Sequence, residues 1–142
     1  MADAEQELRA LVEERVRAVR DKDAATLAER LDREIVTFDA VPPLNSRGKD
    51  AVAQRTQAWI DSYDGPIGYE VDDLQVSVDG DLGVCSFLYH VTGTITSGDQ
   101  VDMWVRATLG CQRVDGKWLI VHDHESVPFD ATTGQALISL TP

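Results

Sequence analysis

The chain has 142 residues, of which 43% are hydrophobic and 27% are charged, so its composition is that of an ordinary globular domain rather than a disordered segment. Its formal net charge of −12 argues against nucleic acid or an anionic membrane as a partner, because either polyanion would repel it. The N-terminus is charged from Asp3 onward, and no stretch approaches the roughly 20 apolar residues of a membrane helix, so neither a signal peptide nor a membrane span is expected. We expect one cytoplasmic domain over residues 1–142.

The first part of the chain is predicted to be largely helical. Apolar residues recur at helical spacing with charges between them: Leu8, Leu11, Val12, Val16 and Val19. Asp23 then offers an N-cap for a second, short helix. A β-branched run at 34–38 follows, and the proline-containing stretch 39–48 cannot form regular structure. A third helix is predicted after Gly48, from one stripe of side chains that ends before Gly65-Pro66: Val52, Thr56, Trp59 and Tyr63.

From Ile67 onward the pattern changes to strands. Runs at about 68–78, 82–96, 100–114 and 117–127 are rich in valine, threonine and aromatic residues, and hairpin signals separate them. Helices followed by long antiparallel strands predict an α+β fold, in which three N-terminal helices pack on one side of a curved, mainly antiparallel β-sheet. The two cysteines, Cys85 and Cys111, are expected to be buried thiols in a reducing compartment.

The segment 101–111 has two different faces, and the residues alone leave its orientation open. One face is apolar: Val101, Met103, Val105, Ala107, Leu109 and Cys111. The other face carries Asp102, Trp104, Arg106, Thr108 and Gly110. Either the apolar face lies under the helices and Arg106 faces water, or Trp104 and Arg106 lie inside a cavity and the apolar face binds a second subunit.

Hairpin register bears on this choice. A two-residue turn at Asp115-Gly116 places His122 opposite Leu109, whereas a three-residue loop with a glycine bulge puts His122 and His124 on the face of Arg106. The same kind of loop centred on Gly98 sets His90 opposite Arg106 and Cys85 opposite Cys111. In that register a set of polar side chains and one tryptophan converges on a concave surface suited to line a pocket: His90, Trp104, Arg106, His122, His124 and Ser126.

Four segments carry a resemblance to a known family: "VTFDAVPPL" (36–44), "GPIGYE" (65–70), "VDMWVRAT" (101–108) and "DGKWLIVHDHESVPFD" (115–130). Together they resemble the nuclear-transport-factor-2-like fold, also called SnoaL-like or ketosteroid-isomerase-like, and in particular a bacterial subfamily largely without an assigned activity. The last segment is also similar to the association domain of calcium/calmodulin-dependent kinases. The resemblance implies a cone-shaped fold around a deep pocket, a homodimer through the outer sheet face, and an interior position for Arg106 and His124.

Asp39 is the first candidate for chemistry. It follows the 34–38 strand at the mouth of the implied cone, where loss of water would raise the pKa of its carboxyl toward the value that a general base needs. The family's isomerases and dehydratases also use an acidic residue near this end. The alternative is that Asp39 only starts the Pro42-Pro43 turn by accepting hydrogen bonds from backbone amides.

The two histidines of "HDH", with Arg106, are the second candidate. His122 and His124 could exchange protons near pH 7, since imidazole in general titrates in that range, and with Arg106 they could polarise a carbonyl or enolate oxygen. The alternative is a structural hydrogen-bond network. A metal site completed by His90 and Asp39 is disfavoured because Arg106 would lie beside the cation, so we expect no metal and no cofactor.

Aromatic and polar side chains are predicted to complete the substrate-binding walls: Phe38, Trp59, Tyr63, Tyr69, His90, Trp104 and Ser126. We expect a cofactor-independent isomerase, cyclase or dehydratase that acts by general acid–base chemistry on an apolar or polyketide-like carbonyl compound. Two other functions of the same fold stay open. One is a non-catalytic module that binds a small ligand through Arg106, and the other is an oligomerisation module.

Overall fold

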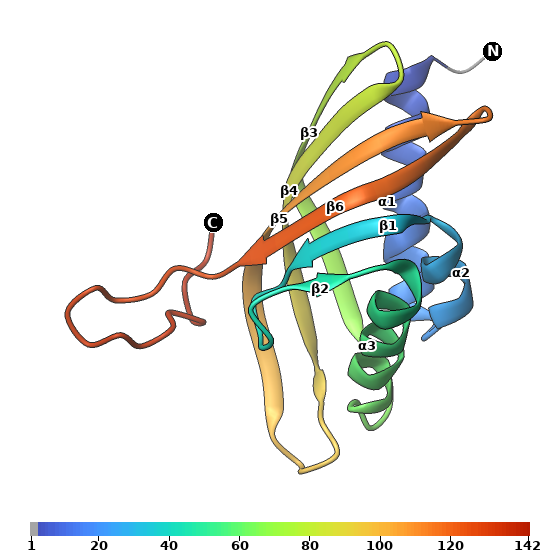
Figure 1. Ribbon diagram of the computed structural model, residues 1–142. Coiled ribbons are helices and arrows are strands. Elements are labelled where there is room, and N and C mark those ends of the chain that lie inside the picture. The colour runs from blue at the N-terminus through green and yellow to red at the C-terminus, as the bar shows by residue number, and fades with distance from the viewer. Residues whose placement is uncertain (1–2) are drawn as a thin grey trace.

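The computed structural model describes residues 3–142. Its elements follow in chain order as α1 (Ala4–Arg20), α2 (Ala24–Glu29), β1 (Leu31–Phe38), β2 (Ser46–Arg47), α3 (Lys49–Asp61), β3 (Gly68–Asp79), β4 (Leu82–Thr94), β5 (Gln100–Val114) and β6 (Lys117–Ser126). Figure 1 shows the helices gathered on one side of a curved sheet, with the segment after β6 extending away from them. The predicted α+β class is confirmed.

The sheet is mixed but mostly antiparallel. Its six strands are ordered β2-β1-β6-β5-β4-β3, and β1 pairs with β6 in parallel while the other neighbours are antiparallel. Because β1 lies beside β6, the last strand, a segment from the N-terminal third of the chain is the neighbour of a C-terminal segment in the sheet. None of the helices in the described part of the chain is long and apolar enough to cross a membrane.

Local sequence explains how the helices begin. Asp3 caps α1 in a capping box with Gln6, in which each side chain bonds the other residue's backbone N–H. Asp23 caps α2 as predicted, since its carboxylate accepts the backbone N–H of Thr26 at 3.1 Å. The buried face of α1 packs on the sheet through Leu8, Leu11, Val12, Ala18 and Val19. Burial of this apolar surface holds the helix in place.

Strand β5 shows which of the two predicted orientations is adopted. Val105, Ala107, Leu109 and Cys111 are each at most 4% exposed beneath the helices, whereas Arg106 and Thr108 are exposed on the other face. The expectation that Arg106 faces an interior cavity is therefore wrong. Burial of large apolar side chains lowers the free energy of the folded state, whereas burial of an unpaired guanidinium raises it. The apolar face therefore turns toward the helices.

The β4–β5 pairing differs from the expected register by two residues. His90 lies opposite Trp104, not Arg106, and Cys85 lies opposite Leu109, not Cys111. The loop is longer than predicted because the strand pairing stops at Thr94, and Ile95 forms a bridge with Tyr63 instead. The two cysteines are nevertheless both buried free thiols.

The β5–β6 pairing combines the two predicted registers. Next to the Asp115-Gly116 turn, Cys111 faces Ile120, as a two-residue turn requires; farther along, Gly110 faces His122. The extra residue is Val121, which makes a β-bulge in β6. Beyond this bulge the side chains change faces: Trp118 and Ile120 point to the core before it, and Asp123 does so after it.

Candidate functional site

A cavity of about 170 Å³ lies between the helices and the inner face of the sheet. Its lining comes from α1, α2, α3, five of the six strands and the loop after β1: Arg15, Val19, Leu27, Leu31, Thr37, Asp39, Ala40, Val41, Val52, Arg55, Thr56, Trp59, Tyr69, Tyr89, Met103, Asp123 and Glu125. The cavity is thus an apolar chamber that contains a group of ionisable side chains. Three predicted site residues, Asp39, Trp59 and Tyr69, contribute to it.

Arg15 of α1 and two carboxyl groups of β6 form the buried centre of this group. Arg15 Nη2 lies 3.0 Å from Asp123 Oδ2 and 3.5 Å from Glu125 Oε2. The three side chains are only 17%, 11% and 14% exposed, respectively, so water screens their charges weakly. Two carboxyl groups therefore share one guanidinium in a poorly hydrated place.

Two tyrosines extend the network into the sheet. Tyr89 on β4 donates its hydroxyl hydrogen to Glu125 Oε1 at 2.6 Å. Its ring stacks on that of Tyr69 of β3, with centroids 4.6 Å apart. The stack holds the Tyr89 ring in place and, with it, the hydroxyl that contacts Glu125. The position of the Glu125 carboxyl therefore depends on β3 and β4 as well as on α1.

The environment changes the protonation of Glu125. Burial, with a smaller contribution from the Asp123 carboxylate, raises the pKa of Glu125 to about 8 against the opposing effect of Arg15. Burial also raises the pKa of Asp123, and the nearby guanidinium of Arg15 opposes the rise. Glu125 is therefore mainly a neutral carboxylic acid at neutral pH, able to donate a proton.

Asp39 lies closer to solvent than Glu125. Its side chain is 40% exposed, its Oδ1 accepts the backbone N–H of Ala40 at 2.6 Å, and its Oδ2 lies 3.8 Å from Arg55 Nη2. Burial, and secondarily Glu125, raises the pKa of Asp39 from its ordinary value. Asp39 thus has the two properties expected of it, a place on the cavity wall and a carboxyl made more basic, and it also makes the predicted turn contact.

The buried pair of Arg15 and Asp123 is not saturated. Within residues 3–142, Arg15 Nε and Asp123 Oδ1 are buried without a hydrogen-bond partner. The pair is therefore joined through Nη2 and Oδ2 alone. An unsatisfied buried donor and acceptor each cost free energy, so this arrangement is unfavourable for stability and is typical of functional sites.

Apart from Tyr63, the remaining predicted site residues lie on the outer face of the sheet, and the expectation that they line the pocket is wrong. His122 Nδ1 contacts the carbonyl oxygen of Val36 at 2.8 Å, and the ring of Phe38 packs edge-on against both His122 and His124. Because Val121 shifts the register of β6, the histidines alternate outward while the carboxyl groups between and after them alternate inward.

The other outward residues form two further contacts. Arg106 Nε donates to Ser126 Oγ at 3.1 Å. His90 stacks on Trp104 at a centroid distance of 4.8 Å and lies 2.6 Å from Asp102. Tyr63 is buried outside the lining, against Trp59 at 5.3 Å between ring centroids. As predicted, His90, Arg106 and the histidine pair share one face of the sheet. That face does not line the cavity.

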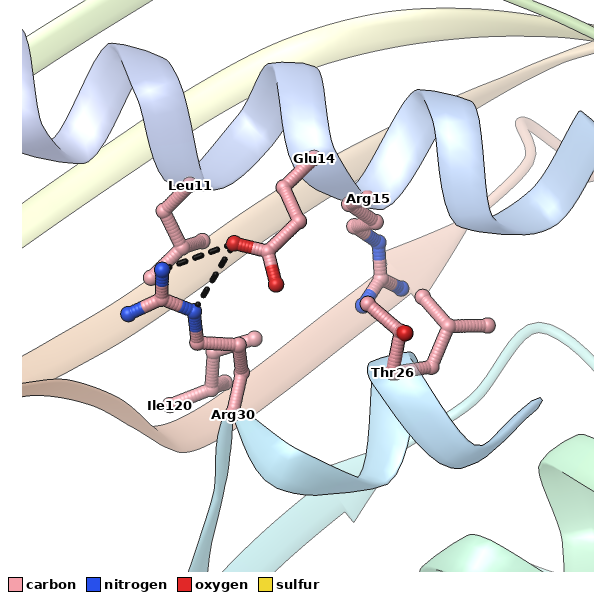
Figure 2. A pocket seen from close by; sticks show the side chains of 7 residues that line it. Leu11, Glu14, Arg15, Thr26, Arg30 and Ile120 are labelled. Carbon is pink, nitrogen blue, oxygen red and sulfur yellow. Dashed lines mark hydrogen bonds and ion pairs between the residues drawn. The ribbon is translucent and has the colours of Figure 1, made fainter. Parts of the chain in front are cut away.

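A second, much smaller hollow lies between α1, α2 and β6 (Figure 2). At about 10 Å³ it has room for no more than a water molecule. The Arg30 guanidinium crosses it to Glu14 at 2.7 Å, and Arg15 points beside Thr26 at its other end. The Arg30–Glu14 contact across this hollow holds α2 against α1, and the hollow is too small for a ligand. Across residues 3–142, no three His, Cys, Asp or Glu side chains are grouped so that they could hold a metal ion.

Sequence reasoning missed Arg15, Tyr89, Asp123 and Glu125. A signal for Arg15 is present, since it lies four residues from both Leu11 and Val19 on the buried stripe of α1. A charged residue at a core position of an amphipathic helix indicates a buried partner of opposite charge. For Asp123 and Glu125 the signal is their two-residue spacing, but their direction depends on the bulge.

Comparisons with known proteins agree with this fold. The model of the SnoaL-like domain matches residues 8–130. A nuclear-transport-factor-2-like protein of unknown function from Pseudomonas putida is 34% identical, with a TM-score of 0.90, over 98% of this chain and 96% of that one.

Two more distant structures share the fold. A candidate dehydratase of the same superfamily from Streptomyces avermitilis is 17% identical (TM-score 0.75; 85% of this chain, 93% of that one). A ketosteroid-isomerase-like protein from Erwinia carotovora is 15% identical (TM-score 0.75; 89% and 97%). No curated protein matches the sequence. The chain belongs to the SnoaL-like family of the nuclear-transport-factor-2-like superfamily.

Proposed function

We propose that this chain is a cofactor-independent enzyme of the isomerase, cyclase or dehydratase kind, acting on an apolar or polyketide-like carbonyl compound in the inner cavity. One observation carries the proposal: the cavity holds two carboxyl groups in unequal environments, Glu125, which is 14% exposed beside Arg15, and Asp39, which is 40% exposed at the mouth. Two carboxyl groups in unequal environments are the arrangement by which one fold supplies an acid and a base at the same pH.

The chemistry follows from these two positions. Asp39, ionised, removes a proton from the carbon next to the substrate carbonyl. Glu125 donates a hydrogen bond or its proton to the carbonyl oxygen, which becomes an enol, and Tyr89 and Arg15 stabilise the resulting carboxylate. Return of the proton from Asp39 to a different carbon gives isomerisation, whereas its transfer to a departing β-hydroxyl releases water and gives dehydration. In both cases the enol oxygen returns its proton to the Glu125 carboxylate as the carbonyl re-forms. The role first expected of Arg106 falls to Glu125, because Arg106 lies on the far face.

The shared first step can be tested without knowing the natural substrate. Proton NMR in D₂O measures exchange of the hydrogens beside the carbonyl in a panel of enolisable ketones. We expect the wild type to accelerate exchange and Asp39→Asn to lower that acceleration by about 100-fold or more. Asp79→Asn, at an exposed strand end, is the matched control and should retain full activity. Ketone binding with no exchange in the wild type would contradict catalysis and favour a ligand-carrying module.

We also propose that residues 1–142 form a single domain that pairs with a second copy through the outer sheet face. That face presents the Trp104–His90 stack and Phe38, which is 40% exposed. Arg106 on this face offsets locally part of the net charge of −12 that otherwise opposes self-association. The apolar residues first expected at the interface, Met103, Val105 and Leu109, lie on the inner face instead. A cytoplasmic location stays a prediction.

Light scattering after gel filtration tests this pairing. The wild type should elute as a dimer, and Trp104→Glu should elute as a folded monomer, because a carboxylate would be buried without a partner in the interface. Gln54→Glu on the exposed side of α3, away from the outer sheet face, is the control and should stay dimeric. A wild-type monomer at high protein concentration would refute the proposal.

A further inference from the structure

The size and the charge of the inner cavity restrict what it can bind. Resting on the function proposed above, we infer that its ligand is an uncharged compound of about one ring that carries a carbonyl or hydroxyl group, and that the corresponding carboxylate anions are rejected. Neither restriction depends on which reaction follows.

The volume sets the first restriction. The cavity measures about 170 Å³. A protein cavity of about 150 Å³ is enough for one benzene ring, whereas sites for drug-sized ligands have roughly 300 Å³ or more. A four-ring steroid therefore does not fit, even though the fold is shared with a ketosteroid-isomerase-like protein.

The walls are consistent with a ring of this size. Trp59 of α3 and Met103 of β5 line the chamber together with short aliphatic side chains. These groups offer flat and adaptable apolar contact but no further polar partners for a long substituted ligand. The charged groups of the lining lie on α1, on β6 and around the Asp39 mouth, and the uncharged polar groups are the hydroxyls of Thr37, Thr56, Tyr69 and Tyr89.

The charges set the second restriction. Two guanidinium groups line the cavity, Arg15 and Arg55, and the carboxyl groups of Asp39, Asp123 and Glu125 lie beside them. Each guanidinium group already has a carboxyl neighbour: Arg15 contacts Asp123 and Glu125 through Nη2, and Arg55 donates to the carbonyl oxygen of Pro42 and lies beside Asp39. A ligand anion would meet carboxylates without a free cation, and the net charge of −12 also slows its approach.

A matched pair of probes tests both restrictions. Acetophenone and benzoate have the same ring but a neutral ketone in one case and an anion in the other, and 2-acetonaphthone adds a second ring. Binding is measured by calorimetry in the wild type in H₂O, where exchange of the acetophenone hydrogens gives no net product, so the result is readable whether or not the protein is an enzyme. We expect acetophenone to bind at least tenfold more tightly than benzoate, 2-acetonaphthone or a four-ring ketosteroid.

Two variants sharpen the test. Trp59→Ala removes an indole from the wall and should raise the affinity for 2-acetonaphthone at least tenfold relative to acetophenone. Asp123→Asn releases Arg15 from its nearest carboxylate and should raise the affinity for benzoate at least tenfold relative to acetophenone. Asp79→Asn should change neither ratio, and retained acetophenone binding shows that each variant is folded.

Benzoate or the ketosteroid binding as tightly as acetophenone would overturn the inference, and so would failure of acetophenone to bind at all. Failure of the catalytic proposal looks different. In that case acetophenone binds selectively, but its methyl hydrogens do not exchange in the wild type.

Discussion

The two halves of β6 run through the same sheet but serve different purposes. Before Val121, Trp118 and Ile120 point inward and are 3% and 2% exposed in the hydrophobic core. After it, Asp123 and Glu125 point inward and meet Arg15. One extra residue in the strand thus separates a part that stabilises the fold from a part that supplies chemistry, a common use of a β-bulge beside a functional site.

The same bulge separates inner from outer groups in the second half. His122 and His124 alternate with Asp123 and Glu125, so four ionisable residues in a row are sorted into two environments. The carboxyl groups enter a poorly hydrated cavity where pKa values change, and His124 stays exposed to water. Residues that are adjacent in this part of β6 therefore do not share a chemical environment.

The largest expected difference between the two faces is in stability. Arg15→Met leaves the two carboxyl groups without their counter-charge, so we expect the free energy of unfolding to fall by about 3–5 kcal/mol. Arg106→Met, on the exposed face, should change it by less than about 0.5 kcal/mol. Urea denaturation followed by circular dichroism measures both. Equal losses of unfolding free energy in the two variants would show that the two faces contribute equally to stability.

The next difference is in activity. Glu125→Gln keeps the shape of the side chain but removes its proton-donating acid, so ketone exchange should fall by about 100-fold, or about 2.7 kcal/mol in barrier. His124→Gln, one residue away but on the outer face, should leave the rate within about twofold. If His124→Gln lowers the exchange rate as much as Glu125→Gln does, the histidines take part in the reaction.

The last expected difference is in the pH dependence of stability. The pKa of Glu125 rises from 4.5 to about 8 on folding, so between these pH values the folded state binds more protons than the unfolded state. The free energy of unfolding must therefore fall as pH rises through this window. Glu125→Gln should lack this part of the fall, measured as a shallower decline in urea midpoints from pH 5 to pH 9. Parallel curves for the two proteins would contradict the raised pKa.

Much of the architecture could be predicted because it depends on local patterns. The stripe containing Leu8 and Val19, the Asp23 cap and the hairpin signals predict helices and strands in the right places, and Asp39 lies on the cavity wall as expected. The orientation of β5 could not be obtained in this way. Both of its faces, one led by Leu109 and the other by Trp104, are plausible interiors until the helices are placed.

By itself, then, the sequence determined the class of fold, the carboxyl group at the mouth and the order of the elements except β2, since Ser46–Arg47 form a short strand in the stretch 39–48 that was expected to be irregular. Propensity, capping and apolar periodicity act over a few residues, and the chain carries that information directly. Only the tertiary structure decided which side chains share the cavity. A strand has a period of two, so the bulge at Val121 exchanged histidines for carboxyl groups at the site. Burial against Arg15, 108 residues away from Asp123, then gave those carboxyl groups their properties.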